Sequence, residues 1–301
     1  MGICRSKKEL FVSHAAALGA NVIYGLNYVI AKGIMPQWLE PRAIIFLRVS
    51  GAVVVFWLTD LFFDSQKISK RDFIRLIFAA FFGVALNQIM FFEGLNLTTP
   101  INASIIMVGT PILVLVISHL ILKEKITGLK LTGVMLGFAG AAFLILRGGH
   151  LDTTGNTMLG NIFILINASS YGLFLVLVKP LMSKYKPLTI MKWVFTFGFV
   201  FVLPVSAKII AKTDFGIIPL KIWFSIGYVI LFTTILAYFL NNFSLKKLSP
   251  PVNSSYIYSQ PLIATIVAVF LSKDRLTITE TVASLLIFTG VYLVTKQKKT
   301  N

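Results

Sequence analysis

The stretch from Ser249 to Arg275, SPPVNSSYIYSQPLIATIVAVFLSKDR, is long and apolar enough to cross a membrane, yet it is rich in hydrogen-bonding groups and proline. A membrane-spanning helix needs about 20 mostly apolar residues. Gln260-Pro261 interrupts this one near its middle. Proline removes a backbone donor and disturbs a helix, and in hydrocarbon the freed carbonyl must face protein or a water-filled cavity. The stretch therefore predicts a broken membrane helix beside a polar cavity.

An earlier part of the chain repeats this stretch. Residues 95–146 align without a gap on residues 245–296, at a constant offset of 150. The matched positions are Leu95, Pro100, Ser104, Pro111, Lys123, Thr127, Leu136, Phe138 and Gly140, which fall on Leu245, Pro250, Ser254, Pro261, Lys273, Thr277, Leu286, Phe288 and Gly290. YGLNYVIAK, Tyr24 to Lys32, resembles YGLFLVLVK, Tyr171 to Lys179, at an offset of 147. The chain therefore contains two copies of one unit.

The composition places the chain in a bilayer. Hydrophobic residues make up 56% of it and charged residues 13%, with a mean hydropathy of +0.85, whereas soluble domains carry roughly 25% charge. This predicts an all-α integral membrane protein with about ten transmembrane helices. The expected spans are 10–32, 42–63, 73–94, 99–122, 128–147, 158–179, 188–208, 220–242, 251–271 and 279–295.

The repeat also predicts the topology. Each copy holds five expected spans, and because five is odd, the second copy enters the membrane facing the opposite way. Such inverted-topology repeats are typical of secondary transporters. We expect two five-helix repeats, 1–150 and 151–301, within one membrane domain. Matching prolines in both copies, Pro111 and Pro261, mark the expected transport site.

The net charge of +17 orients the protein. In a soluble protein such charge would suggest nucleic acid, but here most basic residues fall in loops on one predicted side, as the positive-inside tendency requires. We expect cytoplasmic termini, a bacterial inner-membrane location, the lipid bilayer as partner, no nucleic acid, and a monomer or homodimer. Cys4 is the single cysteine, which excludes an intrachain disulfide and a cysteine-based metal site. No cofactor is expected.

Polar residues at helical spacing mark the expected wet faces of the spans. In the first span Asn21, Tyr24, Tyr28 and Lys32 form such a stripe. The alternative is that such groups hydrogen-bond neighbouring helices as packing contacts. The expected substrate-binding residues are Asn21, Tyr24, Arg48, Gln88, Thr110, Pro111, Tyr171, Tyr238, Asn242, Tyr256, Gln260 and Pro261.

Arg48, Lys192 and Glu93 are charged residues that lie inside expected spans. A charge near the bilayer centre costs at least about 2.5–3.5 kcal/mol, so each needs a partner or a function. Arg48 could bind a substrate carboxylate or could form a structural pair. Lys192 and Glu93 lie near span ends, and we expect them to extend to the interface.

The chain resembles the drug/metabolite transporter superfamily, specifically the EamA-type exporters with ten spans. The resemblance covers essentially the whole chain. The resemblance rests on Tyr24-Gly25, Phe46-Leu47-Arg48, Asn87-Gln88 with Gly94-Leu95, and Pro111…Lys123-Glu124 with its repeated copy Pro261…Lys273-Asp274. It implies that the fifth and tenth spans are peripheral while the others surround the pathway, and that the cargo is an amino acid or another metabolite. Asp274 stands where the family pattern has glutamate, and Val194 lies near the repeat position of Arg48.

Other functions fit less well. Enzymes need a nucleophile with a base, or a metal cluster, and three scattered histidines with short loops offer neither. A channel would favour one continuous polar pore, and no ATP-binding loop is present in the sequence. We therefore expect a non-enzymatic secondary transporter that exports a small zwitterionic or anionic metabolite, most plausibly an amino acid. A channel or facilitator and a multidrug exporter remain alternatives.

Overall fold

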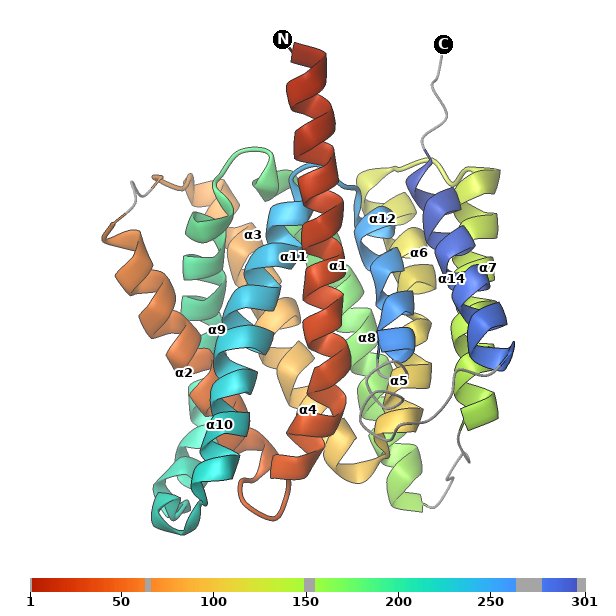
Figure 1. The fold of residues 1–301 in the computed structure, drawn as a ribbon. Coiled ribbons are helices and arrows are strands. Elements are labelled where there is room, and N and C mark those ends of the chain that lie inside the picture. Colours follow the sequence, from red (N-terminus) through yellow and green to blue (C-terminus); the bar gives the residue numbers. More distant parts are fainter. Residues whose placement is uncertain (1, 63–65, 149–154, 264–277, 297–301) are drawn as a thin grey trace.

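The computed structural model describes residues 2–62, 66–148, 155–263 and 278–296, which form helices joined by short connections (Figure 1). No strand occurs in these ranges, which confirms the all-helical prediction. Residues matching the first repeat form α1 (Gly2–Ile34), α2 (Pro41–Asp60), α3 (Lys70–Ala80), the π-helical segment η1 (Phe81–Ala85), α4 (Leu86–Leu97), α5 (Pro100–Val108), α6 (Thr110–Leu122) and α7 (Gly128–Gly148).

The second repeat follows the same order. Its elements are α8 (Gly155–Met182), α9 (Pro187–Lys212), the 3₁₀ turn η2 (Phe215–Ile217), α10 (Leu220–Tyr228), the π-helical segment η3 (Val229–Leu236), α11 (Ala237–Leu245), α12 (Pro250–Ser255), the 3₁₀ turn η4 (Tyr256–Tyr258) and α14 (Ile278–Thr295). Proline opens α2, α5 and α9 at the first turn, where its missing donor costs nothing. The side chains of Ser69 and Thr99 cap α3 and α5.

Within the part of the chain that the structure describes, six helical stretches are long and apolar enough to cross a membrane, so the protein is an integral membrane protein. They are Pro41–Asp60, Lys70–Leu97, Asn102–Leu122, Thr157–Met182, Pro187–Lys212 and Leu220–Leu245. Two shorter apolar helices, Gly128–Gly140 and Thr281–Thr295, coincide with the predicted fifth and tenth spans. The predicted first span falls within the 33-residue α1. The ninth extends beyond the described residues, so the count of ten stays a prediction.

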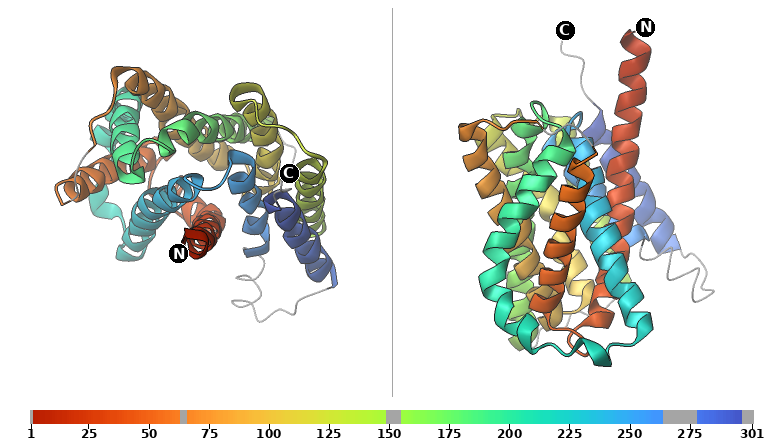
Figure 2. Two further views of the ribbon diagram at one scale, coloured as in Figure 1. Left: turned by 90° about the horizontal axis from the view of Figure 1, so that it is seen from above. Right: turned by 90° about the vertical axis from the view of Figure 1, so that its left-hand side faces the viewer.

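The helices pair across the two repeats. α1 packs on α10, η3 and α11, while α8 packs on α3, η1 and α4; α2 packs on α9, and α7 on α14. α1 and α8 cross the bundle in opposite directions, and α1 begins at the end where α14 finishes (Figure 1). α7 and α14 lie together at one edge in views from the side and from above (Figures 1 and 2). Both edge helices are therefore peripheral, as the resemblance implies.

Irregular turns occur at related positions in the two repeats. The helix of the fourth span breaks at Gly109, between α5 and α6, just before Pro111. The offset of 150 carries residues 106–108 onto η4, which lies just before Pro261. It also carries η1 onto residues 231–235, which lie inside η3. Each repeat thus combines a π-helical third helix with an interrupted fourth helix.

Candidate functional site

A cavity of about 70 Å³ lies between α1, α2, α4, α8 and α11. This is well below the ~300–1,000 Å³ of sites for drug-sized ligands, so it suits a small solute. Six of the twelve expected binding residues line it: Tyr24, Arg48, Gln88, Tyr171, Tyr238 and Gln260. The other lining residues are Asn27, Tyr28, Asn87, Phe91, Met107, Asn167, Thr233 and Ile257.

Repeat-related positions face each other across this cavity. Tyr24 and Tyr171 are related by the offset of 147, and both line it. The offset of 150 relates Gln88 to Tyr238, and it relates Met107 to Ile257. Of the last pair, Met107 lies at the end of α5, just before the interruption at Gly109, and Ile257 lies in η4. Both repeats therefore contribute the same structural positions to one central cavity.

Arg48 supplies the charge in the cavity wall. Its side chain, from α2, is only 3% exposed. Its Nε donates to Thr234 Oγ1 at 2.6 Å, and its Cζ lies 4.7 Å from the centre of the Phe92 ring. No carboxylate of the described residues lies within 4.0 Å of its guanidinium. Since an arginine has five N–H donors in a planar fork, this buried cation still has donors to offer.

The π-helical segments supply polar contacts around the cavity. A π-helix leaves the usual i→i−4 register, so some backbone carbonyls accept from other groups. The Tyr238 hydroxyl lies 2.9 Å from Gly83 O in η1 and 3.2 Å from Asn87 Oδ1. In η3, Thr234 Oγ1 donates to Val229 O at 2.8 Å while it accepts from Arg48. Thr234 thereby orients the guanidinium.

Two polar links hold the cavity walls together. Gln260 Nε2 donates to Asn21 Oδ1 at 2.7 Å, and Tyr28 donates to Gln260 Oε1 at 3.2 Å. On the opposite wall, Asn167 Nδ2 donates to Asn87 O at 2.7 Å and Asn87 Nδ2 to Asn167 O at 3.3 Å. The first link joins α1 to the interrupted ninth span, and the second joins α4 to α8.

Several polar groups of the cavity are buried without a protein partner. The Tyr24 hydroxyl and both amide atoms of Gln88 make no hydrogen bond to the described residues. A buried polar group left without a partner costs about 1–3 kcal/mol, and such groups usually have a specific reason to persist. A bound solute with its own donors and acceptors would satisfy them.

The other six expected binding residues lie outside the cavity lining. Asn21 stands behind it and positions Gln260. Asn242 donates to Tyr238 O at 2.8 Å, and Tyr256 pairs with His14 Nδ1 at 2.8 Å. The remaining three, Thr110, Pro111 and Pro261, are buried in the interrupted helices. Their part in transport stays a prediction.

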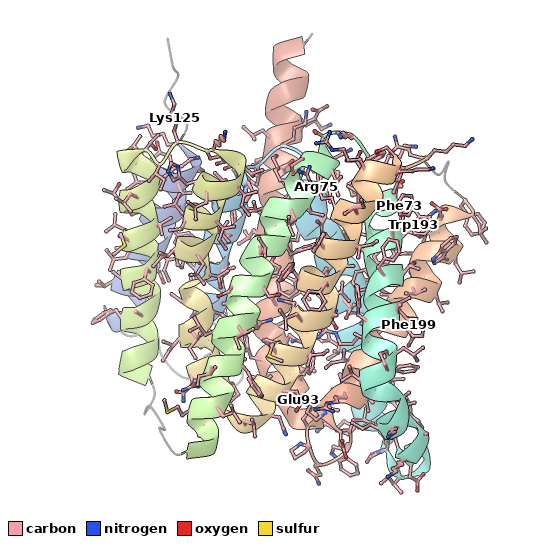
Figure 3. The ribbon with its side chains drawn as sticks, turned by 180° about the vertical axis from the view of Figure 1, so that it is seen from behind. Phe73, Arg75, Glu93, Lys125, Trp193 and Phe199 are labelled. Carbon is pink, nitrogen blue, oxygen red and sulfur yellow. The ribbon has the colours of Figure 1, made fainter. Side chains whose placement is uncertain are left out.

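Lys192 and Glu93, the other two charges discussed above, each form an ion pair. Lys192 is 3% exposed, and its Nζ lies 2.6 Å from Asp60 Oδ2 and 4.6 Å from the Trp57 ring centre. Glu93 Oε1 lies 2.6 Å from Arg42 Nε, and Figure 3 shows Glu93 near the end of the bundle far from the start of α1. Packing of α2 against α9 and α4 brings these partners together, which the expectation for each isolated residue overlooked.

Two lysines at related positions bind helix ends. Lys32 Nζ, in α1, donates to Leu95 O, Asn96 O and Thr98 O at 2.7, 2.9 and 3.1 Å. Lys179 Nζ, in α8, donates to Leu245 O and Leu248 O at 2.6 and 2.7 Å. Carbonyls at a helix C-terminus lack partners and carry partial negative charge, so they attract cations. Because α1 and α8 run in opposite directions, the two contacts lie at opposite ends of the bundle.

Sequence reasoning missed several lining residues. Tyr28 and Asn167 belong to polar stripes that the sequence shows, and Asn87 lies directly beside Gln88, yet none of the three is among the expected binding residues. Asn27 and Thr233 are not among them either. Phe91, Met107 and Ile257 are apolar residues in apolar helices. Met107 and Ile257 carry no signal apart from their position four residues before the repeated prolines, and Phe91 carries none.

Comparisons with known proteins identify the family. The model of the EamA-like transporter family matches residues 12–146 and again residues 158–296. The chain belongs to the EamA-like transporter family. The double match confirms the predicted resemblance and agrees with the offsets found within the sequence.

Two curated proteins and a solved structure are similar to most of this EamA-like transporter. The uncharacterized transporter YetK of Bacillus subtilis is 28% identical over 300 residues, which cover 97% of this chain and 89% of that protein. A probable terminal-alkyne amino-acid exporter of Streptantibioticus cattleyicolor is 22% identical over 203 residues, covering 67% and 66%. A crystal structure matches with a TM-score of 0.74 at 15% identity over 96% of both chains, which shows a common fold.

Proposed function

We propose that this EamA-like transporter exports a small zwitterionic or anionic metabolite, an amino acid or a close derivative, by alternating access. The observation that carries the proposal is Arg48, a buried cation that lines the cavity and pairs with no described carboxylate. Leaving a charge uncompensated inside a protein is costly. A carboxylate on the cargo would compensate it through a charge-assisted hydrogen bond.

The rest of the cavity suits such a cargo. The unpartnered Tyr24 hydroxyl and Gln88 amide offer further polar contacts. Aromatic rings surround the space: Tyr24 and Tyr238 meet edge to face with centres 6.3 Å apart, and Tyr28 and Phe91 lie 5.6 Å apart. Ring faces attract an ammonium group and also provide apolar contact for a side chain. A solute with a carboxylate, an ammonium and a small apolar part would use all three.

Alternating access is supported by the relation between the repeats. In our proposal ten spans form two inverted five-helix repeats around the cavity, with both termini in the cytoplasm of a bacterial cell. α1 and α8 run in opposite directions, and the irregular turns occur at related positions. Interrupted helices in corresponding positions of two halves are characteristic of transport sites. The relative from Streptantibioticus cattleyicolor, named an amino-acid exporter, supports the cargo class.

The experiment compares two arginines of α2 in export from cells or reconstituted vesicles. Arg48→Gln should reduce export of an amino acid at least tenfold more than it reduces export of the corresponding amino acid amide, in which a neutral amide replaces the carboxylate. The reason is that a hydrogen bond to a charged group contributes about 1.5–3 kcal/mol. Arg42→Gln is the control, because Arg42 lies outside the cavity and its side chain is 43% exposed beside Glu93. It should leave the ratio between the two cargos unchanged.

Equal loss for the amino acid and its amide would show that Arg48 is structural. A wild-type preference for lipophilic cations would reject the proposed cargo class and favour a multidrug exporter.

A further inference from the structure

A second, basic groove lies between α3 and α8, at the end of the bundle where α1 begins. Its volume is about 490 Å³, and its polar part contains Arg71, Arg75 and Lys184. Figure 3 shows Arg75 where α3 passes α8 near this end. The groove is separate from the central cavity and shares no lining residue with it. From this groove we infer that the protein has a binding site for the headgroup of an anionic phospholipid.

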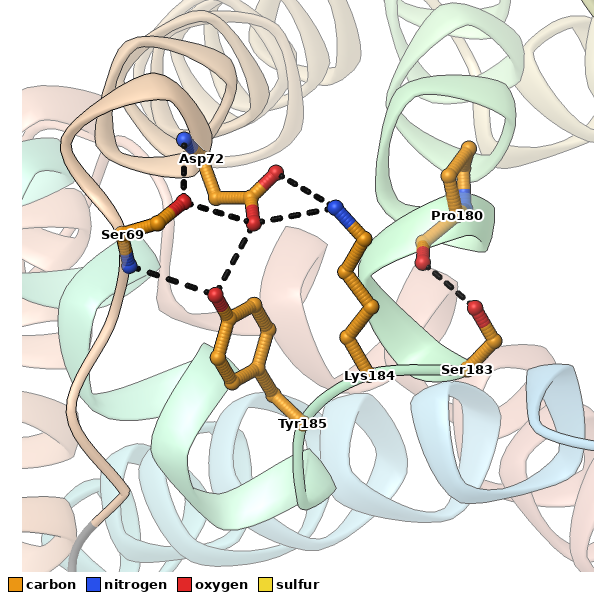
Figure 4. A network of polar contacts seen from close by, with 6 residues as sticks. All are labelled: Ser69, Asp72, Pro180, Ser183, Lys184 and Tyr185. Atoms are coloured by element: carbon orange, nitrogen blue, oxygen red, sulfur yellow. Dashed lines mark hydrogen bonds and ion pairs between the residues drawn. The ribbon is translucent and has the colours of Figure 1, made fainter.

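The groove has an excess of positive charge. Its carboxylate, Asp72, is already engaged: Lys184 Nζ lies 3.1 and 3.2 Å from its two oxygens, and Tyr185 Oη and Ser69 Oγ each lie 2.9 Å from Oδ2 (Figure 4). Arg71 and Arg75 pair with no carboxylate of the described residues. Two guanidinium groups are therefore available, and their planar forks match a phosphate.

The groove walls are held in place by the same contacts. Tyr185 Oη accepts from Ser69 N at 3.2 Å, and Gln66 Oε1 accepts from Lys186 N at 2.5 Å. These bonds fasten the connection between α8 and α9 to the start of α3. Arg71 and Arg75 of α3 and Lys184, which follows α8, thus line one fixed groove.

The groove lies at the depth of lipid headgroups. The helical stretch Lys70–Leu97 has 28 residues, so at ~1.5 Å per residue it is about 42 Å long, whereas the hydrocarbon core is about 30 Å thick. The first turns of α3 therefore extend into the headgroup region. Arg71 and Arg75, one turn apart, share a face there.

An apolar wall continues from the basic part toward the bilayer. Ile74 and Phe78 line the groove one turn apart, and they are 59% and 54% exposed. Leu177 of α8 lines the other side. Free phosphate would use the arginines alone, but a phospholipid would place its phosphate on them and its acyl chains along Ile74 and Phe78. Charge and apolar surface together favour the lipid. This inference does not depend on the identity of the cargo.

The test measures lipid retention by the purified full-length protein with native mass spectrometry. Wild type should retain phosphatidylglycerol in preference to phosphatidylcholine. Arg71→Gln/Arg75→Gln should weaken phosphatidylglycerol binding by about fivefold for each arginine, which corresponds to about 1 kcal/mol per basic residue near anionic lipid. The control is Lys208→Gln/Lys212→Gln, which removes two exposed charges of α9 at the opposite end. It should bind phosphatidylglycerol as wild type does.

Three results would overturn the inference. They are equal retention of the two lipids by wild type, unchanged phosphatidylglycerol binding by the double arginine variant, and full displacement of phosphatidylglycerol by millimolar inorganic phosphate. The last would show a site for free phosphate. The comparison of two lipids on wild type needs no variant, so misfolding of the arginine variant would leave the test intact.

Discussion

Tyr24 and Tyr171 occupy related positions in the two repeats, but their hydroxyl groups differ in hydrogen bonding. Tyr171 Oη accepts from Asn241 Nδ2 at 2.8 Å. The Tyr24 hydroxyl is buried in the same cavity wall without a partner among the described residues. The Tyr171 hydroxyl thus stabilises the fold, and the Tyr24 hydroxyl is available to bind a solute.

Phenylalanine substitutions should separate these roles. Tyr24→Phe should maintain or raise thermal stability, because it removes a buried hydroxyl that makes no hydrogen bond to the described residues, but it should weaken cargo binding by several-fold. Tyr171→Phe should destabilise the protein by about 1–3 kcal/mol, because Asn241 loses its acceptor. Thermal unfolding and cargo titration of both variants provide the comparison. A larger stability loss for Tyr24→Phe than for Tyr171→Phe would contradict it.

The sequence predicts which polar residues line the cavity better than it predicts which apolar residues do. Tyr24, Gln88 and Gln260 are conspicuous because hydrogen-bonding groups are rare in apolar helices. Met107 and Ile257 are not, because an apolar residue can face lipid, protein or a cavity with no change in composition. Ion pairs such as Lys192–Asp60 depend on which helices pack together, and local spacing contains no such information.

Among the elements, α1 and α8 each carry a lysine that contacts the C-terminal end of another helix. Lys32 binds the end of α4, and Lys179 binds the end of α11. α1 otherwise has few contacts with α4, as α8 has with α11. The central cavity lies between these pairs, and each lysine joins the two helices of one pair at one end of the bundle.

Removing either lysine should therefore make the cavity more accessible from the end of the bundle at which that lysine lies. With Met107→Cys as a reporter in a Cys4→Ser background, Lys32→Met should increase labelling from the face opposite the start of α1. Lys179→Met should increase labelling from the face where α1 starts. Lys208→Met, an exposed control, should change neither rate. Increased labelling from the same face in both lysine variants would refute this assignment of ends.

For the whole molecule, the internal offset predicted more than the hydropathy did. The offset of 150 relates the interrupted helices, the π-helical segments and two pairs of cavity residues, and the offset of 147 relates a third pair. The reason is that two copies of one unit fold alike. The hydropathy predicted all-helical spans and their approximate bounds. Neither could predict the cross-repeat pairing of helices, which depends on the shapes of their side chains.

Orientation is testable with single cysteines in the Cys4→Ser background. Lys67→Cys lies between α2 and α3, and Ile217→Cys lies in the exposed η2 turn. In intact cells an impermeant maleimide should label Ile217→Cys at once and Lys67→Cys only after permeabilisation, because basic loops stay in the cytoplasm. Labelling of both from one face would exclude the inverted arrangement.

The glycine contacts between α7 and α14 have a consequence for biosynthesis. A Cβ at Gly133 would lie 2.7 Å from Gly290 O, and one at Gly140 would lie 2.7 Å from Leu286 Cβ. These partners are about 150 residues apart, so at roughly 5–20 residues per second the ribosome makes α14 about 8–30 s after α7. During that interval lipid or an insertion factor must cover the glycine face of α7. A nascent chain stalled before α14 would leave the glycine face of α7 without its partner helix.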